Sequence, residues 1–439
     1  MPEIVTQKNE RFGLLSFSTM FNKKIIIVTP WFERFAGGAE LLARGMAREL
    51  NKRGVETMVF TTCSLSPYDS WWKDHYQPGV YDVEGIETHR FGTGKGRAKY
   101  DAAITQIQKG ATLTDHEEQD FFDHGINSPT LVDALEKYLS DEFEIIALPY
   151  FHGLTHSVVN RYAGKISLVP CFHNEAQFYW NATEKLLRNA KHIFFNSAEE
   201  KQMTIKQYGR TLGRKIVESV VAGIGVELPQ SGEKLDSFPS RLPDRYFVYA
   251  GRKEVGKNVP LLCQWFSDYA ITTGAGTKLV FLGGGDKSLV PSRDCFIDLG
   301  VVSEATKQHL ISGALGLINL SENESFSLVL MEGWLLGVPT VVSAKCDVTR
   351  SHVTRSNGGL FVANTEEFAR ALRYLEDNAE MRSKLAANGR KYVSQAFSYD
   401  RVLEKYLRVF DEPVEASLPG RPALPVTIGA PTKPGYCLE

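Results

Sequence analysis

The chain has 439 residues, of which 43% are hydrophobic and 11% are aromatic. This length exceeds what one hydrophobic core usually supports, so it predicts two or three domains. The 50 basic side chains nearly balance the 52 acidic ones and leave a formal charge of −2, which argues against a protein that coats nucleic acid. No stretch approaches about 18 uninterrupted apolar residues, so the sequence predicts no membrane-spanning helix.

The N-terminal residues do not read as a secretory signal, because Glu3 lies early and no basic segment precedes an apolar stretch. The cysteines are far apart in the sequence and form no CxxC pair, which favours reduced thiols over a disulfide framework or a zinc site. We therefore expect a cytoplasmic protein. The cysteines are Cys63, Cys171, Cys263, Cys295, Cys346 and Cys437.

A first domain is expected over residues 23–228, after an N-terminal extension of residues 1–22. Residues 25–28 form an apolar, β-branched run typical of a strand buried on both faces. Strand-like and helix-like stretches then alternate, which predicts a mainly parallel, doubly wound sheet. Further strands are expected at 57–62, 86–91, 144–148, 166–170 and 192–196, and helices at 39–53, 128–139, 177–188 and 198–207.

Residues 93–127 interrupt this alternation and are acidic around 115–123. We interpret them as a helical insertion that contributes to acceptor binding. A solvated surface excursion is the equally weighted alternative.

A linker is expected at residues 229–245, which are rich in proline, serine and charge. The pattern then restarts and predicts a second α/β domain over residues 246–397, an amphipathic helix over 398–412 and a disordered, proline-rich tail over 413–439. In the second domain, strands are expected at 246–250, 278–282, 316–320, 340–342 and 359–362, and helices at 259–270, 304–312, 328–336, 366–376 and 380–395. Such sheets bind ligands at the carboxyl ends of their strands, so two of them predict a cleft between the domains.

The strongest motif runs from Glu324 to Glu332, at the junction of an expected strand and helix. Backbone N–H groups near Ser327 and Leu328 are then the unpaired donors of a helix N-terminus, which attracts phosphate. Carboxylates on either side suit the hydroxyl groups of a sugar and a ribose. The alternative is a pair of ordinary helix-cap acids.

Arg252 and Lys257 follow the first strand of the second domain, five residues apart around a glycine-containing loop. Both can converge on an anion, although taken alone they are more readily interpreted as solvated surface cations. With the Glu324–Glu332 motif they predict a diphosphate site whose positive charge comes from protein. The chain has no Asp-x-Asp sequence, the usual holder of a divalent ion beside a nucleotide diphosphate, so no metal is expected.

In the first domain, Gly37 and Gly38 occupy a loop-to-helix junction where the backbone can approach a ligand. The sequence is not the GxGxxG of dinucleotide enzymes, which weakens a dehydrogenase interpretation. A plain turn is the alternative.

Two histidines follow first-domain strands, at the edge where a ligand-facing residue is expected. His173 is the stronger candidate and His152 the weaker. His152, together with Asn174 and Glu175 beside His173, is a candidate for the acceptor side. For each histidine, a packed or surface role is the alternative.

In this order, the motifs resemble those of the retaining GT-B-fold glycosyltransferases of family 4, also called glycosyl transferases group 1. The resemblance covers residues 24–410, and its 170–175 and 195–197 stretches look most like bacterial surface-polysaccharide members. The matching pieces are residues 37–40, 84–91, 170–175, 195–197 with Glu200, 223–226, Gly251-Arg252 with Lys257, 324–332 and 337–339.

The resemblance implies an α/β GT-B fold: two doubly wound, Rossmann-like domains face a cleft, and the C-terminal helix crosses back to the first domain. It implies catalytic roles for His173, Glu324, Arg252 and Lys257. By similarity, Arg252 and Lys257 hold the donor diphosphate together with the loop of Gly37 and Gly38 and the amides of Ser327 and Leu328. Glu332 then binds the ribose, Glu324 the hydroxyls of the transferred sugar, and His173 lies beside the reacting sugar.

The sequence departs from the family's common Glu-Gly-Phe-Gly, because Ser325 and Ser327 replace both glycines. Tighter backbone approach at the two serines leaves the preferred donor sugar open.

The expected activity is transfer of a hexose from a UDP- or GDP-sugar to a hydroxyl of a glycan or lipid-linked saccharide, in cell-surface polysaccharide biosynthesis, without metal or other cofactor and without nucleic acid. A catalytically silent GT-B scaffold that binds a nucleotide sugar, and a GT-B epimerase or phosphorylase, remain alternatives. A basic cluster suggests either a solvated face, which we favour, or peripheral contact with the inner face of a membrane. It comprises Lys185, Arg188, Lys191, Lys201, Lys206, Arg210, Arg214 and Lys215.

Overall fold

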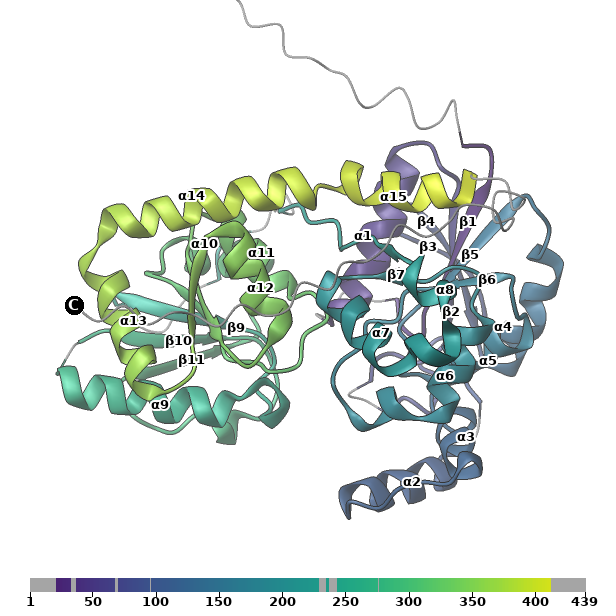
Figure 1. Cartoon of the computed structure of the whole chain (residues 1–439), viewed down its shortest axis with the longest axis horizontal. Coiled ribbons are helices and arrows are strands. Elements are labelled where there is room, and N and C mark those ends of the chain that lie inside the picture. The colour runs from purple at the N-terminus through teal and green to yellow at the C-terminus, as the bar shows by residue number, and fades with distance from the viewer. Residues whose placement is uncertain are drawn as a thin grey trace, which may run out of the picture.

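Two α/β domains lie side by side in the computed structural model of the chain (Figure 1). The structure describes residues 21–32, 37–67, 70–94, 96–228, 234–236, 243–274 and 276–411. Most of the expected extension, part of the linker and the proline-rich tail therefore lie outside the described residues. Within them, Asp236 of the linker accepts a hydrogen bond from the Ser303 backbone (2.7 Å), which fixes this part of the linker on the second domain.

The first domain is built on a six-stranded sheet in the order β3-β4-β2-β1-β5-β6, in which only β3 runs antiparallel to its neighbour. The apolar side chains of β1 and β2 are buried on both faces, as their sequences predict. A small parallel pair, β7-β8, continues beyond β6. The strands are β1 (Lys24–Val28), β2 (Thr57–Thr62), β3 (Gly79–Val83), β4 (Ile86–Phe91), β5 (Phe143–Ala147), β6 (Ile166–Leu168), β7 (Phe194–Phe195) and β8 (Val220–Val221).

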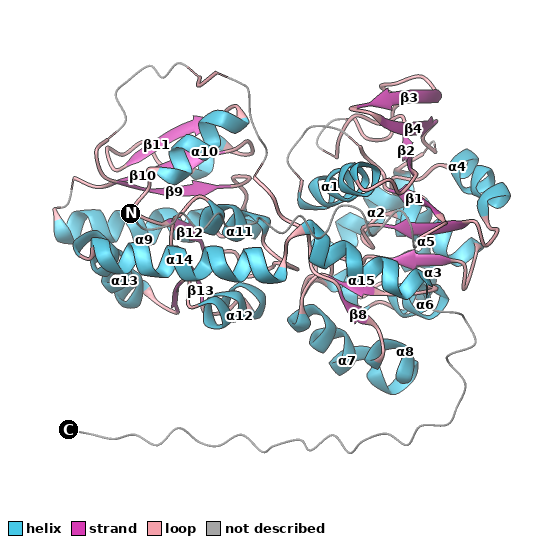
Figure 2. Cartoon of the chain, turned by 90° about the horizontal axis from the view of Figure 1, so that it is seen from above, coloured by secondary structure: helices cyan, strands magenta, loops and turns pink. Residues whose placement is uncertain are grey.

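Helices cover both faces of this sheet (Figure 2). They are α1 (Gly38–Lys52), α4 (Pro129–Ala134), α5 (Gly153–Arg161), α6 (Asn181–Asn189), α7 (Ala198–Leu212) and α8 (Arg214–Val217). The helix expected at 128–139 is shorter, because a 3₁₀ turn, Leu135–Tyr138, follows α4. The helix expected at 177–188 begins later, because Trp180 is extended and separates a 3₁₀ turn from α6.

The stretch 93–127 forms two helices, α2 (Ala98–Gln108) and α3 (Asp115–Asp123), which project from the first domain on the side away from the last helix (Figure 1). A capping box starts α3: the Thr114 hydroxyl and the Glu117 carboxylate satisfy each other's backbone N–H groups. Phe121 and Phe122 of α3 are buried against the domain.

The second domain has a six-stranded, fully parallel sheet in the order β11-β10-β9-β12-β13-β14. Its strands are β9 (Tyr246–Ala250), β10 (Lys278–Leu282), β11 (Phe296–Gly300), β12 (Leu317–Asn319), β13 (Thr340–Ser343) and β14 (Gly359–Val362). Its helices are α9 (Val259–Thr273), α10 (Glu304–Ser312), α11 (Leu328–Leu335), α12 (Asp347–Ser356), α13 (Thr365–Asp377) and α14 (Ala379–Ala396).

The last helix, α15 (Tyr399–Asp411), leaves the second domain and packs on the first, which confirms the expected crossover (Figure 1). Its Tyr406 ring stacks on Phe194 at 4.2 Å, and its Phe410 meets Phe21 at 6.5 Å. Lys405 donates a hydrogen bond to the carbonyl of Ala222 (2.8 Å). The first domain's core is therefore completed by the C-terminal end of the described chain.

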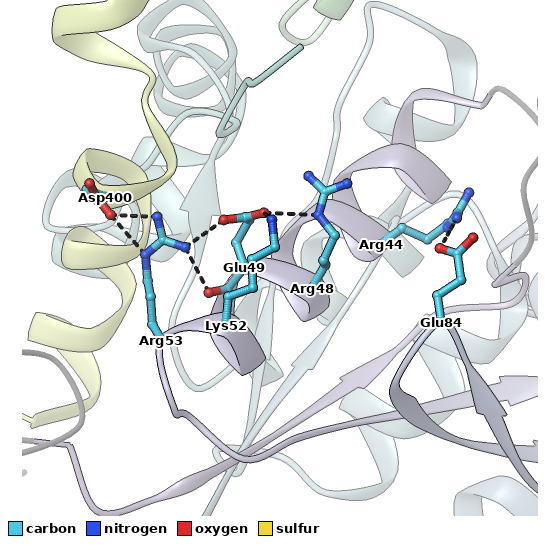
Figure 3. Close-up of polar contacts among 7 residues, drawn as sticks. All are labelled: Arg44, Arg48, Glu49, Lys52, Arg53, Glu84 and Asp400. Carbon is cyan, nitrogen blue, oxygen red and sulfur yellow. Dashed lines mark hydrogen bonds and ion pairs between the residues drawn. The ribbon is translucent and has the colours of Figure 1, made fainter. Parts of the chain in front are cut away.

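A chain of ion pairs joins α15 to α1 (Figure 3). The Arg53 guanidinium contacts Asp400 of α15 at 2.6 Å and the Glu49 carboxylate of its own helix at 2.6 Å. Glu49 is 3% exposed and also pairs with Arg48 and Lys52. Burial raises the pKa of Glu49, but its hydrogen bonds to Lys52, Arg53 and Arg48 outweigh burial and lower it.

The five cysteines within the described ranges carry free thiols, as predicted, and Cys437 lies outside those ranges. None of the described helices is both long enough and apolar enough to span a membrane.

Candidate active site

The loops after the parallel strands of the two domains face each other. The Asn196 amide of the first domain donates to the Ser325 hydroxyl of the second at 3.5 Å. The charges of Glu324, Lys257 and Arg252 all act on His173 across the domain boundary. The structure thus brings the four residues for which catalytic roles are expected into one electrostatic neighbourhood.

Lys257 and Glu324 form the centre of the second domain's part of the site. Lys257 ends a 3₁₀ turn after β9, and Glu324 lies in the loop between β12 and α11. The Lys257 Nζ is 2.8 Å from the Glu324 Oε1, and their side chains are 25% and 12% exposed. Arg252, in the same loop as Lys257, pairs with Glu254 at 3.1 Å. Both expected phosphate-binding cations are therefore held by carboxylates on the protein.

Glu324 is ionised at neutral pH. Burial raises the pKa of its carboxyl group, but the charge of Lys257 and the hydrogen bond from it outweigh burial and lower the pKa below its usual value. Asn319, at the end of β12, donates to Glu324 at 3.4 Å and to the Ser327 hydroxyl at 3.1 Å. The carboxylate is thus fixed from two sides, and Asn319 is a site residue that sequence reasoning missed.

Ser327 immediately precedes α11, with φ +74°, a left-handed conformation that glycine adopts at least cost. The Ser327 side chain does not cap the helix, because its hydroxyl accepts from Asn319 instead. The first N–H groups of α11, beginning at Leu328, therefore lack a Ser327 cap at the end of the helix that attracts anions. A serine in this conformation carries local strain that a glycine would not.

Glu332 lies one turn inside α11. The Lys307 ammonium contacts it at 3.2 Å and also contacts Glu304 at 2.9 Å. Burial raises the pKa of Glu332, and the charge of Lys307 opposes the rise only in part. A carboxyl group in this position can accept hydrogen bonds from vicinal hydroxyls, which is the expected ribose contact.

The Gly37-Gly38 junction lies within electrostatic reach of Arg252. A Cβ atom on Gly37 would be 1.7 Å from the Glu40 carboxylate, whereas a Cβ atom on Gly38 would meet no neighbouring atom within 4 Å. Burial raises the pKa of Glu40, and the charge of Arg252 opposes that rise. The start of α1 therefore faces the second domain's cationic loop, with open space over Gly38.

His173 lies beyond β6 and is held as a neutral imidazole at pH 7, because burial lowers its pKa despite Glu175 and Glu324 nearby. Its Nδ1 is 3.8 Å from the Glu175 Oε1, and the Tyr150 hydroxyl donates to that same oxygen at 2.6 Å. Asn174 accepts from the Tyr179 hydroxyl at 2.6 Å. Sequence reasoning missed Tyr150, which follows β5 and carries no motif of its own.

His152 precedes α5 and is also neutral, since burial lowers its pKa to about 3. Its ring packs on Trp31 at 4.8 Å and on Phe151 at 5.6 Å. It thus belongs to an aromatic cluster at the same sheet edge as His173.

The buried Glu200 carboxyl group fixes the backbone of two loops of the first domain. The buried Glu200 carboxyl group accepts hydrogen bonds from the backbone N–H groups of Phe172 and Asn196, each at 2.6 Å, and burial raises its pKa to about 8.

In the second domain, the backbone approaches itself closely beneath the Arg252 loop. Gly283 has φ +117°, and a Cβ atom there would lie 2.3 Å from the Gly251 carbonyl oxygen. Sequence reasoning did not use the three successive glycines after the expected strand, 283–285, which are the signal that predicts this close approach.

Comparison with known proteins relates the second domain's part of this site to a family. Residues 232–392 match the family model described as glycosyl transferases group 1. No curated protein sequence matches the chain significantly.

Solved structures share the whole architecture. Trehalose-6-phosphate synthase OtsA has a TM-score of 0.67 at 11% identity, covering 89% of this chain and 100% of that one. A sucrose-phosphate synthase from Thermosynechococcus elongatus has a TM-score of 0.61 at 16% identity, covering 90% and 100%. Anabaena HepE in complex with UDP and glucose has a TM-score of 0.59 at 15% identity, covering 90% and 100%.

Two facing, doubly wound domains with a returning C-terminal helix define the GT-B fold, which is confirmed. The chain has this fold, and residues 232–392, which include most of the second domain, are similar to the glycosyl transferases group 1.

Proposed function

We propose that the protein is a retaining glycosyltransferase that moves a hexose from a UDP- or GDP-sugar to a hydroxyl of a glycan or lipid-linked saccharide, without a metal, in cell-surface polysaccharide biosynthesis. One observation carries the proposal: the Lys257–Glu324 pair stands beside Arg252 at the N-terminus of α11 and faces His173 across the domain boundary. Two of the similar structures support a nucleotide-sugar donor. HepE is in complex with UDP and glucose, and a trehalose-6-phosphate structure from E. coli is bound with UDP-2-fluoro glucose.

The donor fits this site by charge. Arg252, Lys257 and the first N–H groups of α11 offer positive charge to a diphosphate, and the open space over Gly38 lets the first domain approach it. Glu324 accepts hydrogen bonds from hydroxyls of the transferred sugar, and Glu332 accepts them from the ribose. A phosphate that enters the site competes with Glu324 for Lys257, which leaves Glu324 free to turn toward the sugar.

Catalysis follows from the same charges. Departure of the nucleoside diphosphate develops negative charge that Arg252, Lys257 and the helix N-terminus stabilise. An acceptor hydroxyl then attacks the oxocarbenium-like sugar on the face that the diphosphate leaves, and a donor phosphate oxygen takes the proton. The neutral imidazole of His173 orients the sugar and the acceptor. Glu324 stabilises positive charge on the sugar and forms no covalent bond.

Turnover of a panel of UDP- and GDP-sugars in EDTA tests the proposal. We expect activity in EDTA, with Lys257→Ala and Glu324→Ala each lowering kcat/KM at least about tenfold. Lys278→Ala is the matched control, because Lys278 also pairs with a carboxylate, Asp294, but begins β10 and thus lies at the opposite edge of the sheet. Near-wild-type kinetics in both site variants contradict the proposed donor site.

Other outcomes identify the alternatives. Activity lost in EDTA and restored by Mg²⁺ contradicts metal independence. Donor binding without turnover on any acceptor extract indicates a scaffold. Product formed without an acceptor indicates an epimerase, and a phosphate requirement indicates a phosphorylase.

We propose a cytoplasmic location, with the basic cluster of the first domain as a solvated face. Several of its charges are balanced locally, since Arg188 pairs with Glu184, Lys191 with Glu144 and Arg214 with Glu218. Flotation with anionic lipid vesicles checks this assignment, and salt-sensitive binding supports peripheral membrane contact instead.

A further inference from the structure

Six aromatic rings form a series of neighbouring contacts from the sheet edge that carries His173 to the base of α2. Neighbouring ring centroids along the series are 5.6, 5.9, 4.7, 5.2 and 5.6 Å apart. All but the buried Phe121 are partly exposed. In order, the rings of this aromatic path are His152, Phe151, Phe121, Tyr100, Trp71 and Trp72.

The path begins at the ligand edge of the first sheet. His152 and Phe151 follow β5, and Trp71 and Trp72 lie in the connection that follows β2. The strands β2, β1 and β5 run parallel in the same sheet. Both segments therefore lie at the carboxyl end of the sheet, as His173 does after β6. Trp31, which packs on His152, donates its indole N–H to Ser64 of the β2 connection at 3.0 Å and ties the two segments together.

The far end of the path combines aromatic faces with hydrogen-bonding groups. The Arg97 guanidinium lies 3.9 Å above the Trp72 ring and forms two hydrogen bonds with Asp101, at 2.7 and 2.6 Å. Lys99 and Asp120 pair at 2.9 Å between α2 and α3. The partly exposed Trp72 ring thus lies beside charged groups.

We propose that the aromatic path binds the saccharide part of the acceptor, so that the acceptor is an oligosaccharide several sugar units long. A pyranose ring presents a face of C–H groups, which the electron-rich face of an indole or phenol ring attracts, and an edge of hydroxyls, which carboxylates and guanidinium groups bind. The proposal rests on the proposed function, because the path starts at the sheet edge on which His173 lies.

A lipid chain fits this surface poorly. The exposed positions of α2 include Ala98, Ala102, Thr105 and Gln108, which are small or polar, so the helix offers no broad apolar face. Covering the Arg97–Asp101 and Lys99–Asp120 pairs with hydrocarbon also costs their solvation. Where the natural acceptor carries a lipid, its saccharide occupies the path and its lipid lies elsewhere.

Tryptophan fluorescence with glucose and N-acetylglucosamine oligomers of one to six units tests the proposal. We expect binding that strengthens with oligomer length. Trp72→Ala should weaken it at least about tenfold, which is about 1.4 kcal/mol, and Trp72→Phe should restore most of it. Trp265→Ala is the matched control, since Trp265 is also partly exposed but packs on Phe368 in the second domain. Thermal unfolding of each variant verifies that it is folded.

Separate readouts distinguish the possible failures. Donor binding and donor hydrolysis without an acceptor should be unchanged in Trp72→Ala. If the wild-type protein binds a nucleotide sugar but no oligomer in the panel, or if Trp72→Ala binds oligomers normally, the aromatic path is overturned and the proposed function stands. If no nucleotide sugar binds, the proposed function fails. Vesicle binding that depends on Trp72 assigns the path to a lipid and also overturns the proposal.

Discussion

Glu200 offers a sharp test of how the cleft loops are held. Its carboxyl group accepts two backbone N–H groups from separate loops of the first domain and is 1% exposed. Glu200→Gln preserves the shape, but the amide nitrogen cannot accept a hydrogen bond. One N–H group, of Phe172 or Asn196, then loses its acceptor, which costs about 1–3 kcal/mol.

The effect of this substitution should reverse with pH. Burial raises the pKa of Glu200 from its ordinary value of 4.5 to about 8, so the folded chain keeps a proton that the unfolded chain releases above pH 4.5. The wild-type free energy of unfolding therefore falls by about 1.4 kcal/mol per pH unit, or about 4 kcal/mol over three units, relative to a variant that does not titrate. The wild type should be more stable than Glu200→Gln at pH 5 and less stable at pH 8.

Urea denaturation at pH 5, 6, 7 and 8 measures the difference between the two proteins. Glu49→Gln is the matched control, because Glu49 is also largely buried but its cationic partners lower its pKa (Figure 3). Its effect should be constant over this range, where both its folded and its unfolded states are ionised. A Glu200→Gln difference that does not change between pH 5 and 8 refutes the reasoning.

Two further predictions concern acid sensitivity and domain closure. Burial lowers the pKa of three histidines to about 3, so below pH 6.5 the unfolded chain binds protons that the folded chain does not. Urea midpoints should therefore fall steeply from pH 6 to pH 4. Histidine-to-glutamine variants that leave this slope unchanged contradict the assignment. These histidines are His152, His156 and His352. Arg355 of the second domain makes two contacts with Glu199 of the first, at 2.6 and 3.2 Å, so Arg355→Ala should weaken closure by about 1 kcal/mol and enlarge the radius of gyration in X-ray scattering. The control Arg350→Ala removes contacts that stay within the second domain, a pair with Asp347 in α12 and a hydrogen bond to the Ala344 carbonyl. Equal scattering from both variants counts against the Arg355–Glu199 contact as a closure element.

The sequence predicts the parts of the fold that are buried and periodic. The strands of the second domain with apolar runs, such as β9 and β10, lie where expected because their side chains are buried on both faces. β3 and β11 were missed because both are partly exposed and carry no continuous apolar run. α12 was missed because its polar sequence lacks a clear apolar stripe.

The candidate site divides in the same way. Lys257 and Glu324 were predictable because each lies in a motif after a strand. The charge interaction of Glu40 with Arg252 and the hydrogen bond of Tyr150 to Glu175 join segments that meet only when sheets and domains pack. No local pattern encodes which of these residues meet, so the two pairings emerge only from the structure.

The return of α15 to the first domain determines how the two domains can move. The second domain is joined to the first by two covalent connections, one through the linker after residue 228 and the other between α14 and α15. A body attached at two points retains mainly a rotation about the line between them, so opening and closing should follow one hinge axis. The first domain is also discontinuous in the chain: a fragment ending at residue 228 exposes the apolar surface that Tyr406 and Phe410 cover, and expressing that domain alone requires α15 to be supplied with it.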